Sequence, residues 1–184
     1  MGTTPQKSDI KFTYYDYTQL PEDKRYELIE GDFYMTPSAT TRHQTVSSKL
    51  QFRLTQYVEG KNFGLVLAAP LDVVFSDEDV VQPDIIFISQ DRKGIIKPEN
   101  IRGAPDLVIE ILSPATAARD LGVKKRLYAK HAVLEYWVVN PEDQTIEVMS
   151  WTEKGFKTEQ VYPKSSALRS KILPDFTLPV GQIF

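Results

Sequence analysis

The chain has 184 residues, 41% of them hydrophobic and 26% charged, a composition typical of a single soluble globular domain. It contains no cysteine, which excludes disulfides, thiolate metal sites and thiol nucleophiles. The formal net charge of −3 argues against a protein that coats nucleic acid through a general basic excess, although a local basic face is compatible with it.

The first predicted elements are two short strands in YELIEGDFYMTPS, which begins at Tyr26. A tight turn joins them at Gly31, because glycine adopts the positive φ that such a turn requires. Apolar residues at helical spacing then predict an amphipathic helix that starts at Thr40 or Thr41 as its cap and stops at Gly60.

Three apolar runs follow, which we interpret as three core strands: FGLVLAAPLDVVF (63–75), VVQPDIIFIS (80–89) and DLVIEILSP (106–114). A second helix is predicted from about Thr116 to Lys130. LEYWVVN then reads as another strand, and TIEVMSWTEKGFKTEQVY as an antiparallel hairpin that turns at a glycine. The final stretch, LPDFTLPVGQIF, is expected to pack as an irregular tail.

This order predicts an α/β protein in which one mixed sheet is flanked by two helices, with an extra hairpin towards each end. We expect one domain over residues 1–184, with an N-terminal extension (1–20) and a C-terminal hairpin and tail (152–184). No run approaches the roughly 18 apolar residues that span a bilayer, and the first residues lack the features of a signal peptide. The expected location is therefore the cytoplasm, away from membranes.

Two of the apolar runs each contain an acid where a buried strand should have none, Asp84 and Glu110. A buried carboxylate is costly unless it is paired or bound to a metal, so each acid needs a cationic partner. Mg²⁺ takes oxygen ligands, and the two carboxylates could share one ion with a strand carbonyl such as that of Ile111. Pro83 removes a backbone donor just before Asp84, which allows the strand to bend there.

A metal site that hydrolysed a phosphodiester would also need a positive group beside the metal. The residue two positions after Glu110 is Leu112, which cannot supply it. The second predicted helix offers Lys124, which follows Asp120 and precedes Tyr128 at a spacing of four. Lys124 is therefore the candidate.

An α-β-β-β-α-β core with Pro-Asp on its second strand and Glu-Ile-Leu on its third resembles the PD-(D/E)XK nuclease superfamily. Within it, the span from about Tyr26 to Trp151 resembles the Uma family of restriction-endonuclease-like proteins, formerly a domain of unknown function. The matching pieces are YELIEGDFY, Arg42-His43-Gln44, APLDVVF, VVQPDIIFIS, RGAPDLVIEILSP, DLGVKKRLY and LEYWVVNP.

This resemblance implies a restriction-endonuclease-like fold and a Mg²⁺- or Mn²⁺-dependent endonuclease that acts on DNA. It implies Asp84 and Glu110 as metal ligands, Lys124 as the positive group and Glu27 as a further carboxylate. The chain departs from the superfamily pattern at Leu112, where the superfamily's own lysine would lie. Because cutting both strands of DNA needs two sites, a homodimer is a further expectation.

Each candidate also has a purely structural interpretation. Asp84 could cap a bulge at Pro83, and Glu27 could be an ordinary outward charge on a hairpin strand. Lys124 could pair with Asp120 on a solvated helix face, a contact worth about 0.3–0.5 kcal/mol. Two acids in two adjacent apolar strands nevertheless favour a shared site.

Three further cations are candidates for contact with phosphate or DNA. His43 lies in the first turn of the first helix, whose positive end suits an anion, but it could equally be a surface residue. Arg119 and Lys125 belong to a basic run that could meet a phosphate backbone or form an ordinary exposed helix face. His131, at the end of the second helix, is explained by the helix dipole.

Two other functions remain open. The acidic balance and Leu112 are compatible with a non-catalytic module that keeps the fold for DNA binding or protein assembly. Such a module would bind its partner whether or not metal is removed. Hydrolysis of RNA or of a nucleotide is a third possibility, because the sequence shows no base-reading motif that would select DNA.

Overall fold

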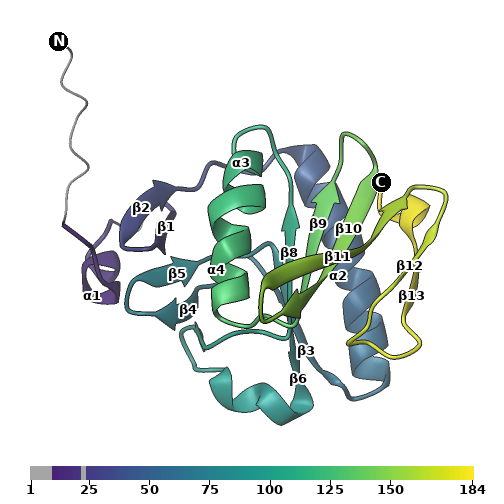
Figure 1. Ribbon diagram of the computed structural model, residues 1–184, viewed down its shortest axis with the longest axis horizontal. Coiled ribbons are helices and arrows are strands. Elements are labelled where there is room, and N and C mark those ends of the chain that lie inside the picture. The colour runs from purple at the N-terminus through teal and green to yellow at the C-terminus, as the bar shows by residue number, and fades with distance from the viewer. Residues whose placement is uncertain (1–9, 22–23) are drawn as a thin grey trace.

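The computed structural model describes residues 10–21 and 24–184, which form two main sheets and one small sheet (Figure 1). The six-stranded sheet has the order β11-β10-β9-β8-β6-β3. Its strands are β3 (Gly64–Ala68), β6 (Ile85–Ser89), β8 (Leu107–Ile111), β9 (Glu135–Asn140), β10 (Thr145–Thr152) and β11 (Gly155–Pro163). Strand β8 is antiparallel to β6 and parallel to β9, so the sheet is mixed as expected.

The second main sheet has the order β2-β1-β5-β4-β7. Its strands are β1 (Tyr26–Ile29), β2 (Asp32–Met35), β4 (Val73–Ser76), β5 (Asp79–Val81) and β7 (Ile101–Arg102). The predicted N-terminal hairpin is confirmed as β1 and β2, and Gly31 in its turn has a φ of +72°. The described part of the predicted N-terminal extension forms α1 (Tyr14–Thr18), and the Tyr14 amide donates to the Asp77 carbonyl beside β5.

The two predicted helices are both present. Helix α2 (Thr41–Gly60) is capped by Thr40, whose hydroxyl accepts from the His43 amide at 3.2 Å. The second predicted helix consists of α3 (Ala117–Arg119), a π-helical turn η2 (Asp120–Lys124) and α4 (Lys125–Lys130). Two 3₁₀ segments, η1 (Gln90–Ile95) and η3 (Val180–Gln182), complete the helical elements of the described chain.

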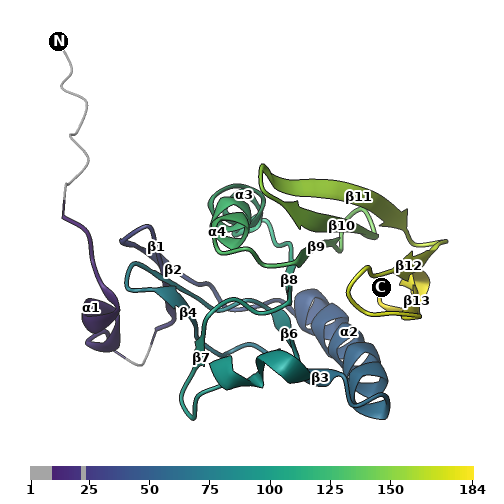
Figure 2. The same cartoon turned by 60° about the horizontal axis from the view of Figure 1, so that its bottom comes forward.

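The two helices cover opposite faces of the six-stranded sheet, as Figure 2 shows. Strand residues alternate between the faces. Ile109 and Ile111 of β8 belong to the apolar cluster that contains Leu50 of α2, whereas Val108 belongs to the cluster that contains Leu127 of α4. Residue 110, between Ile109 and Ile111, therefore points towards α4.

The predicted single sheet is wrong, because the first two apolar runs each divide between both sheets. Residues 63–75 form β3 and then β4, and residues 80–89 form β5 and then β6. The divisions fall at Pro70 and Pro83, which cannot donate a ladder hydrogen bond. The two crossings lie side by side, because the Ala69 amide donates to the carbonyl of Asp84 at 3.0 Å.

The C-terminal hairpin is confirmed as β10 and β11, but the tail is more regular than predicted. It contributes β13 (Thr177–Pro179), which pairs with β12 (Ala167–Arg169), the strand before the predicted tail, in a two-stranded sheet. The buried carboxylate of Glu135 holds the connection between these two strands, accepting from the Ser170 hydroxyl at 2.7 Å and the Lys171 amide at 2.9 Å. A tertiary anchor of this kind leaves no local pattern in the sequence.

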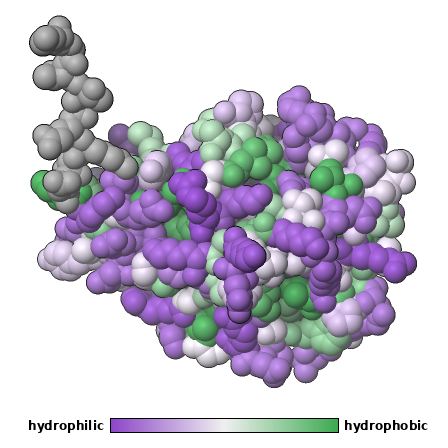
Figure 3. All heavy atoms as spheres, in the orientation of Figure 1, coloured by the Kyte–Doolittle hydropathy of each residue, from purple (hydrophilic) through white to green (hydrophobic). Residues whose placement is uncertain are grey.

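The face seen in Figure 3 is mainly hydrophilic, with hydrophobic residues in small separate groups. Within the described residues, no helix combines the length and the apolar character that a membrane span requires. The division of the chain into one domain with two extensions stays a prediction.

A buried aspartate joins the five-stranded sheet to the end of α4. Asp79 accepts from Lys130 Nζ at 2.9 Å, from His131 Nε2 at 3.1 Å, from the Ser76 hydroxyl at 3.0 Å and from the Glu30 amide at 2.9 Å. Burial alone would raise the pKa of Asp79, but the hydrogen bonds from these donors outweigh it and lower the pKa. His131 thus has a structural role.

We expect Asp79→Asn to lower the free energy of unfolding at neutral pH by about 1–3 kcal/mol, the usual cost of breaking a buried hydrogen-bond network. A carboxyl whose pKa is depressed by folding stabilises the fold above its unfolded pKa, near 3.8, and this stability is lost as the pH falls below that value. Urea titrations of both proteins across the acid range measure the difference. A gap that did not shrink towards acid pH would contradict this account.

Candidate metal centre

The two strand acids lie opposite each other where β6 and β8 meet. Ile85 of β6 pairs with Ile109 of β8, so the next position along places Asp84 across from Glu110. Asp84 is not inside a strand as the sequence pattern indicated: it directly precedes β6, beyond the break at Pro83, and its side chain is 19% exposed. Its Oδ2 accepts the Ile111 amide at 2.7 Å, which fixes the carboxylate against β8.

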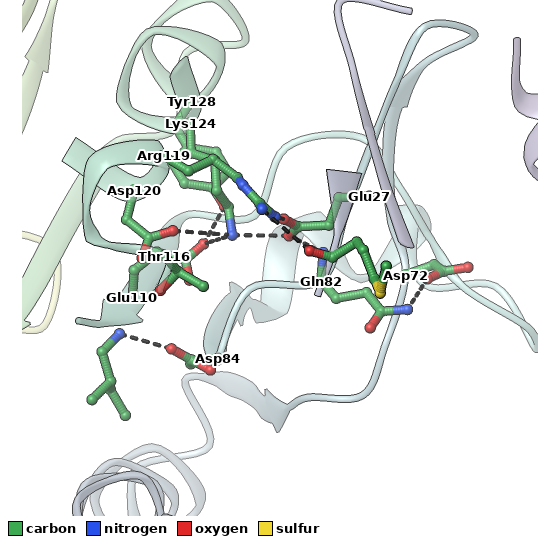
Figure 4. A network of polar contacts seen from close by, with 12 residues as sticks. Glu27, Asp72, Gln82, Asp84, Glu110, Thr116, Arg119, Asp120, Lys124 and Tyr128 are labelled. Carbon is green, nitrogen blue, oxygen red and sulfur yellow. Dashed lines mark hydrogen bonds and ion pairs between the residues drawn. The ribbon is translucent and has the colours of Figure 1, made fainter. Parts of the chain in front are cut away.

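Lys124 lies at the centre of a carboxylate cluster rather than on a solvated helix face (Figure 4). Its Nζ is 2.6 Å from Oε1 of Glu110, 2.9 Å from Oε1 of Glu27 and 3.6 Å from Oδ1 of Asp120. The Lys124 side chain is only 4% exposed. The interpretation of Lys124 as a simple surface partner of Asp120 is therefore wrong.

The local shape of the second helix positions this lysine. The π-helical turn η2 begins at Asp120 and ends at Lys124, and both of these residues are buried. A π-turn inserts one extra residue into an α-helix and rotates the following residues by about 100° around the axis. Because such turns occur often at functional sites, η2 is a reason to look for a site on this helix.

Burial and mutual repulsion set the charges in the cluster. Burial raises the pKa of Glu110 well above its usual value, and the charges of Asp120, Asp84 and Glu27 raise it further against the effect of Lys124. Burial would also raise the pKa of Glu27, but Lys124, the Gln82 amide and Arg119 outweigh it and lower that pKa.

Lys124 responds in the opposite direction. Burial alone would lower its pKa, but the charges of Glu110, Glu27 and Asp120 outweigh burial and raise the pKa above its usual value. Lys124 therefore stays protonated at neutral pH.

Each of the two strand acids is anchored through one oxygen only. Oε1 of Glu110 accepts from the Tyr128 hydroxyl at 2.5 Å and contacts Lys124, while Oδ2 of Asp84 accepts from the Ile111 amide and lies 3.1 Å from His43 Nε2. Among residues 10–21 and 24–184, no hydrogen bond reaches the second oxygen of either side chain. The two carboxylates are thus fixed in place with one oxygen each for a ligand.

Both acids line a hollow of about 250 Å³. Its lining includes four acids, Glu27, Asp84, Glu110 and Asp120, and the basic residues Arg25, His43 and Lys124. Residues 36–40 and 113–116 also line it. The negative charges in the hollow exceed the positive ones, so it is suited to a cation.

The donor set fits Mg²⁺ or Mn²⁺. These ions bind through one or two carboxylates, and water and substrate oxygens complete the coordination. Asp84 and Glu110 supply such oxygens. None of the described residues that line the hollow is a methionine or cysteine, so the site has no sulfur ligand. No group of three or more His, Asp or Glu side chains in the described chain forms a ready-made cage, which Mg²⁺ does not require.

Two other predicted phosphate or DNA contacts, Arg119 and Lys125, lie outside the lining of the hollow. Arg119 donates to Oε2 of Glu27 at 3.1 Å and to the Met35 carbonyl at 3.2 Å, so its guanidinium holds Glu27 and does not line the hollow. Lys125 is half-buried and lies outside the lining of the hollow. The predicted basic run is therefore not one exposed face.

His43 is close to the acids, where burial alone would lower its pKa. The hydrogen bond and the charge of Asp84 outweigh burial and raise the pKa of His43 above its usual value. Its closest polar partner is thus Asp84, and the predicted contact with phosphate stays a prediction.

Sequence reasoning missed three members of the site as functional residues. Asp120 and Tyr128 both contact the cluster, and the signal for them was their spacing of four on either side of Lys124. Gln82 was also missed: its amide donates to Oε1 of Glu27 at 3.1 Å.

Comparison with known proteins agrees with the fold. A crystal structure of "a putative nuclease belonging to DUF820" from Anabaena variabilis superposes with a TM-score of 0.79 over 94% of this chain and 97% of that one, at 22% identity. An uncharacterised protein of Synechocystis sp. is 25% identical over 143 residues, 76% of this chain and 74% of that protein. The model of the Uma2 family, described as "Putative restriction endonuclease", matches residues 14–181, and the chain therefore belongs to the Uma2 family.

Proposed function

We propose that this protein is a Mg²⁺- or Mn²⁺-dependent endonuclease that hydrolyses DNA phosphodiester bonds on a restriction-endonuclease-like core of α2, β3, β6, β8, α3–α4 and β9. The observation that carries the proposal is the meeting of Asp84 and Glu110, each with one oxygen left for a ligand, beside the buried, protonated Lys124. The description of the Uma2 family supports it.

The proposed mechanism assigns the residues separate tasks. Asp84 and Glu110 would hold the cation, which when bound neutralises phosphate charge and acidifies a water molecule. Lys124 cannot act as a base, because its neighbours raise its pKa; it instead donates a hydrogen bond and positive charge towards the reacting phosphate. Glu27 and Asp120 hold Lys124 in place, and Arg119 holds Glu27.

Lys124 can replace the lysine that the superfamily pattern has at the position of Leu112. Leu112 stands where the superfamily lysine would lie, but Lys124 brings an ammonium group within 2.6 Å of Glu110 from the neighbouring helix. A positive group thus reaches the acid from a different element of the fold.

The proposal is tested by calorimetric titration of Mn²⁺ into the wild-type protein, with supercoiled plasmid incubated in parallel under Mg²⁺, Mn²⁺ or EDTA. We expect saturable binding, and cleavage that EDTA abolishes. A homodimer with two sites would convert the plasmid to its linear form, whereas one site would only nick it. A folded protein that neither binds Mn²⁺ nor cleaves DNA would overturn the proposal.

The second candidate function is the non-catalytic module, which Leu112 and the net charge of −3 favour. It differs in one measurable respect: it would bind DNA or a protein partner equally well with EDTA present. The third candidate function is hydrolysis of RNA. Metal-dependent cleavage of a labelled RNA strand in the same assay, without cleavage of DNA, would favour it over the other two.

His43 is a positioning residue in this proposal, because its Nε2 lies 3.1 Å from the anchored oxygen of Asp84. We expect His43→Leu to weaken Mn²⁺ binding by about 10-fold or more, the usual effect of losing a partner of a metal ligand. His43→Gln keeps a donor on a side chain of similar reach and should restore most of the affinity. Equal affinities for all three proteins by calorimetry would remove His43 from the site.

A further inference from the structure

A second hollow, of about 450 Å³, adjoins the acid-lined one. The two hollows share Thr40, His43, Ser113 and Pro114, so they lie on either side of these residues. Beyond these shared residues, the second hollow is lined by Arg42, Leu112, Ala117, Asn140, Pro141 and Glu142.

The walls of the second hollow are chiefly apolar, through Leu112, Pro114, Ala117 and Pro141. Leu112 stands at the superfamily's lysine position. With the ammonium group supplied by Lys124 instead, this position is left to form an apolar wall.

The side chains of Arg42, Asn140 and Glu142, which line the hollow, are already engaged in hydrogen bonds. Arg42 donates to Oε1 of Glu142 at 3.1 Å and to the Pro141 carbonyl. The Asn140 side chain donates to Asp143 at 2.7 Å and accepts the amide of Glu142 at 3.0 Å. The hollow therefore offers flat apolar contact and few groups that could read the edge of a ligand.

We propose that this hollow receives the unstacked nucleobase of the nucleotide next to the phosphate at the acid cluster. The inference rests on the proposed function and names its substrate class, DNA that is single-stranded or locally unpaired. Phosphate and base of one nucleotide are covalently linked, and the acid-lined hollow, which would take the phosphate through its cation, shares lining residues with the apolar one. A base inside a duplex has both faces covered by its neighbours and cannot enter.

The residues that line the hollow also predict that it discriminates only weakly among the four bases. Apolar contact with a ring face is available to every base, whereas discrimination depends on hydrogen bonds to the base edges. Because Arg42 and Asn140 are held by Glu142 and Asp143, we expect little preference among the four bases at this position.

The test fills the hollow without touching the acid cluster. Ala117 lines the hollow, whereas its neighbour Ala118 is exposed and does not line it, so Ala117→Leu and Ala118→Leu form a matched pair. The probes are a short fluorescent single strand, the same strand with abasic nucleotides, and its duplex. Affinities are measured by anisotropy with Ca²⁺ in place of Mg²⁺, and circular dichroism checks that both variants are folded.

We expect wild type and Ala118→Leu to bind the single strand about 10-fold more tightly than the abasic strand or the duplex, a factor that corresponds to one modest stacking contact. Ala117→Leu should lose this preference. Wild-type affinities that do not differ among the probes, or a preference that survives in Ala117→Leu, would overturn the inference, as would no binding of any probe.

The same measurements separate this inference from the proposed function. A preference for the single strand that Ala117→Leu abolishes, without cleavage under Mn²⁺, supports the base site and counts against the nuclease. Cleavage by wild type and Ala117→Leu at equal rates on duplex and single strand supports the nuclease and overturns the base site.

Discussion

Lys124→Met is expected to lower the free energy of unfolding at neutral pH by about 3–5 kcal/mol, the cost of removing one partner from a buried ionic cluster. Methionine has a similar shape but carries no charge. The substitution leaves Glu27 and Glu110 buried beside Asp120, and the cation that remains in contact among the described residues is Arg119, through Glu27. Urea unfolding of wild type and variant measures the loss.

The pH dependence of this loss follows from the shifts in the cluster. Glu27 has a lowered pKa in the folded wild type, so its contribution to stability is present above its unfolded pKa, near 4.5, and is lost as the pH falls. In Lys124→Met the unpaired acids take up protons on folding, and acid pH then relieves their repulsion. The difference between the two proteins should therefore narrow towards acid pH.

Lys125→Met is the matched control, because Lys125 is the next residue, is half-buried and makes no ion pair with any described residue. It should change stability by no more than about 0.5 kcal/mol. A loss below about 1 kcal/mol in Lys124→Met, or equal losses in both variants, would mean that the cluster is hydrated and not held together by Lys124.

The parts of the fold that the sequence could predict are those with a strong periodic pattern. Leu50 and Leu54 at helical spacing, with Thr40 as a cap, are sufficient to define α2, and the acids in two apolar runs correctly indicated neighbouring strands. Pro83 indicated a bend, but the assignment of the two parts of each run to different sheets was not predictable, because a strand has the same alternation whichever sheet it joins.

The site was predictable to the extent that its residues lie in such patterns. Glu27 is 97 positions from Lys124. The two residues come together only because β1 belongs to the second sheet, which the sequence did not predict. Neither the π-helical turn that faces Lys124 inward nor the amide of Gln82 that holds Glu27 leaves a local signal. Long-range contacts of this kind depend on the whole fold.

Asp84→Asn is expected to abolish metal-dependent cleavage while leaving the fold intact. Loss of a ligand to the cation should remove about 3 kcal/mol or more of transition-state stabilisation, which corresponds to a loss of rate of about 100-fold or more. Asparagine keeps an oxygen that can accept the Ile111 amide, so the anchor to β8 remains. Plasmid cleavage and Mn²⁺ calorimetry measure the loss.

Stability separates this substitution from Lys124→Met. Asp84 contributes to the repulsion that raises the pKa of Glu110, so removing its charge should leave the free energy of unfolding unchanged or slightly higher. Asp91→Asn is the control: Asp91 is exposed and lies beyond the opposite end of β6, and its replacement should affect neither cleavage nor stability. Metal-dependent cleavage retained by folded Asp84→Asn would remove Asp84 from the metal centre. Loss of cleavage with stability retained would instead distinguish a residue that binds the cation from one, like Lys124, that also holds the fold together.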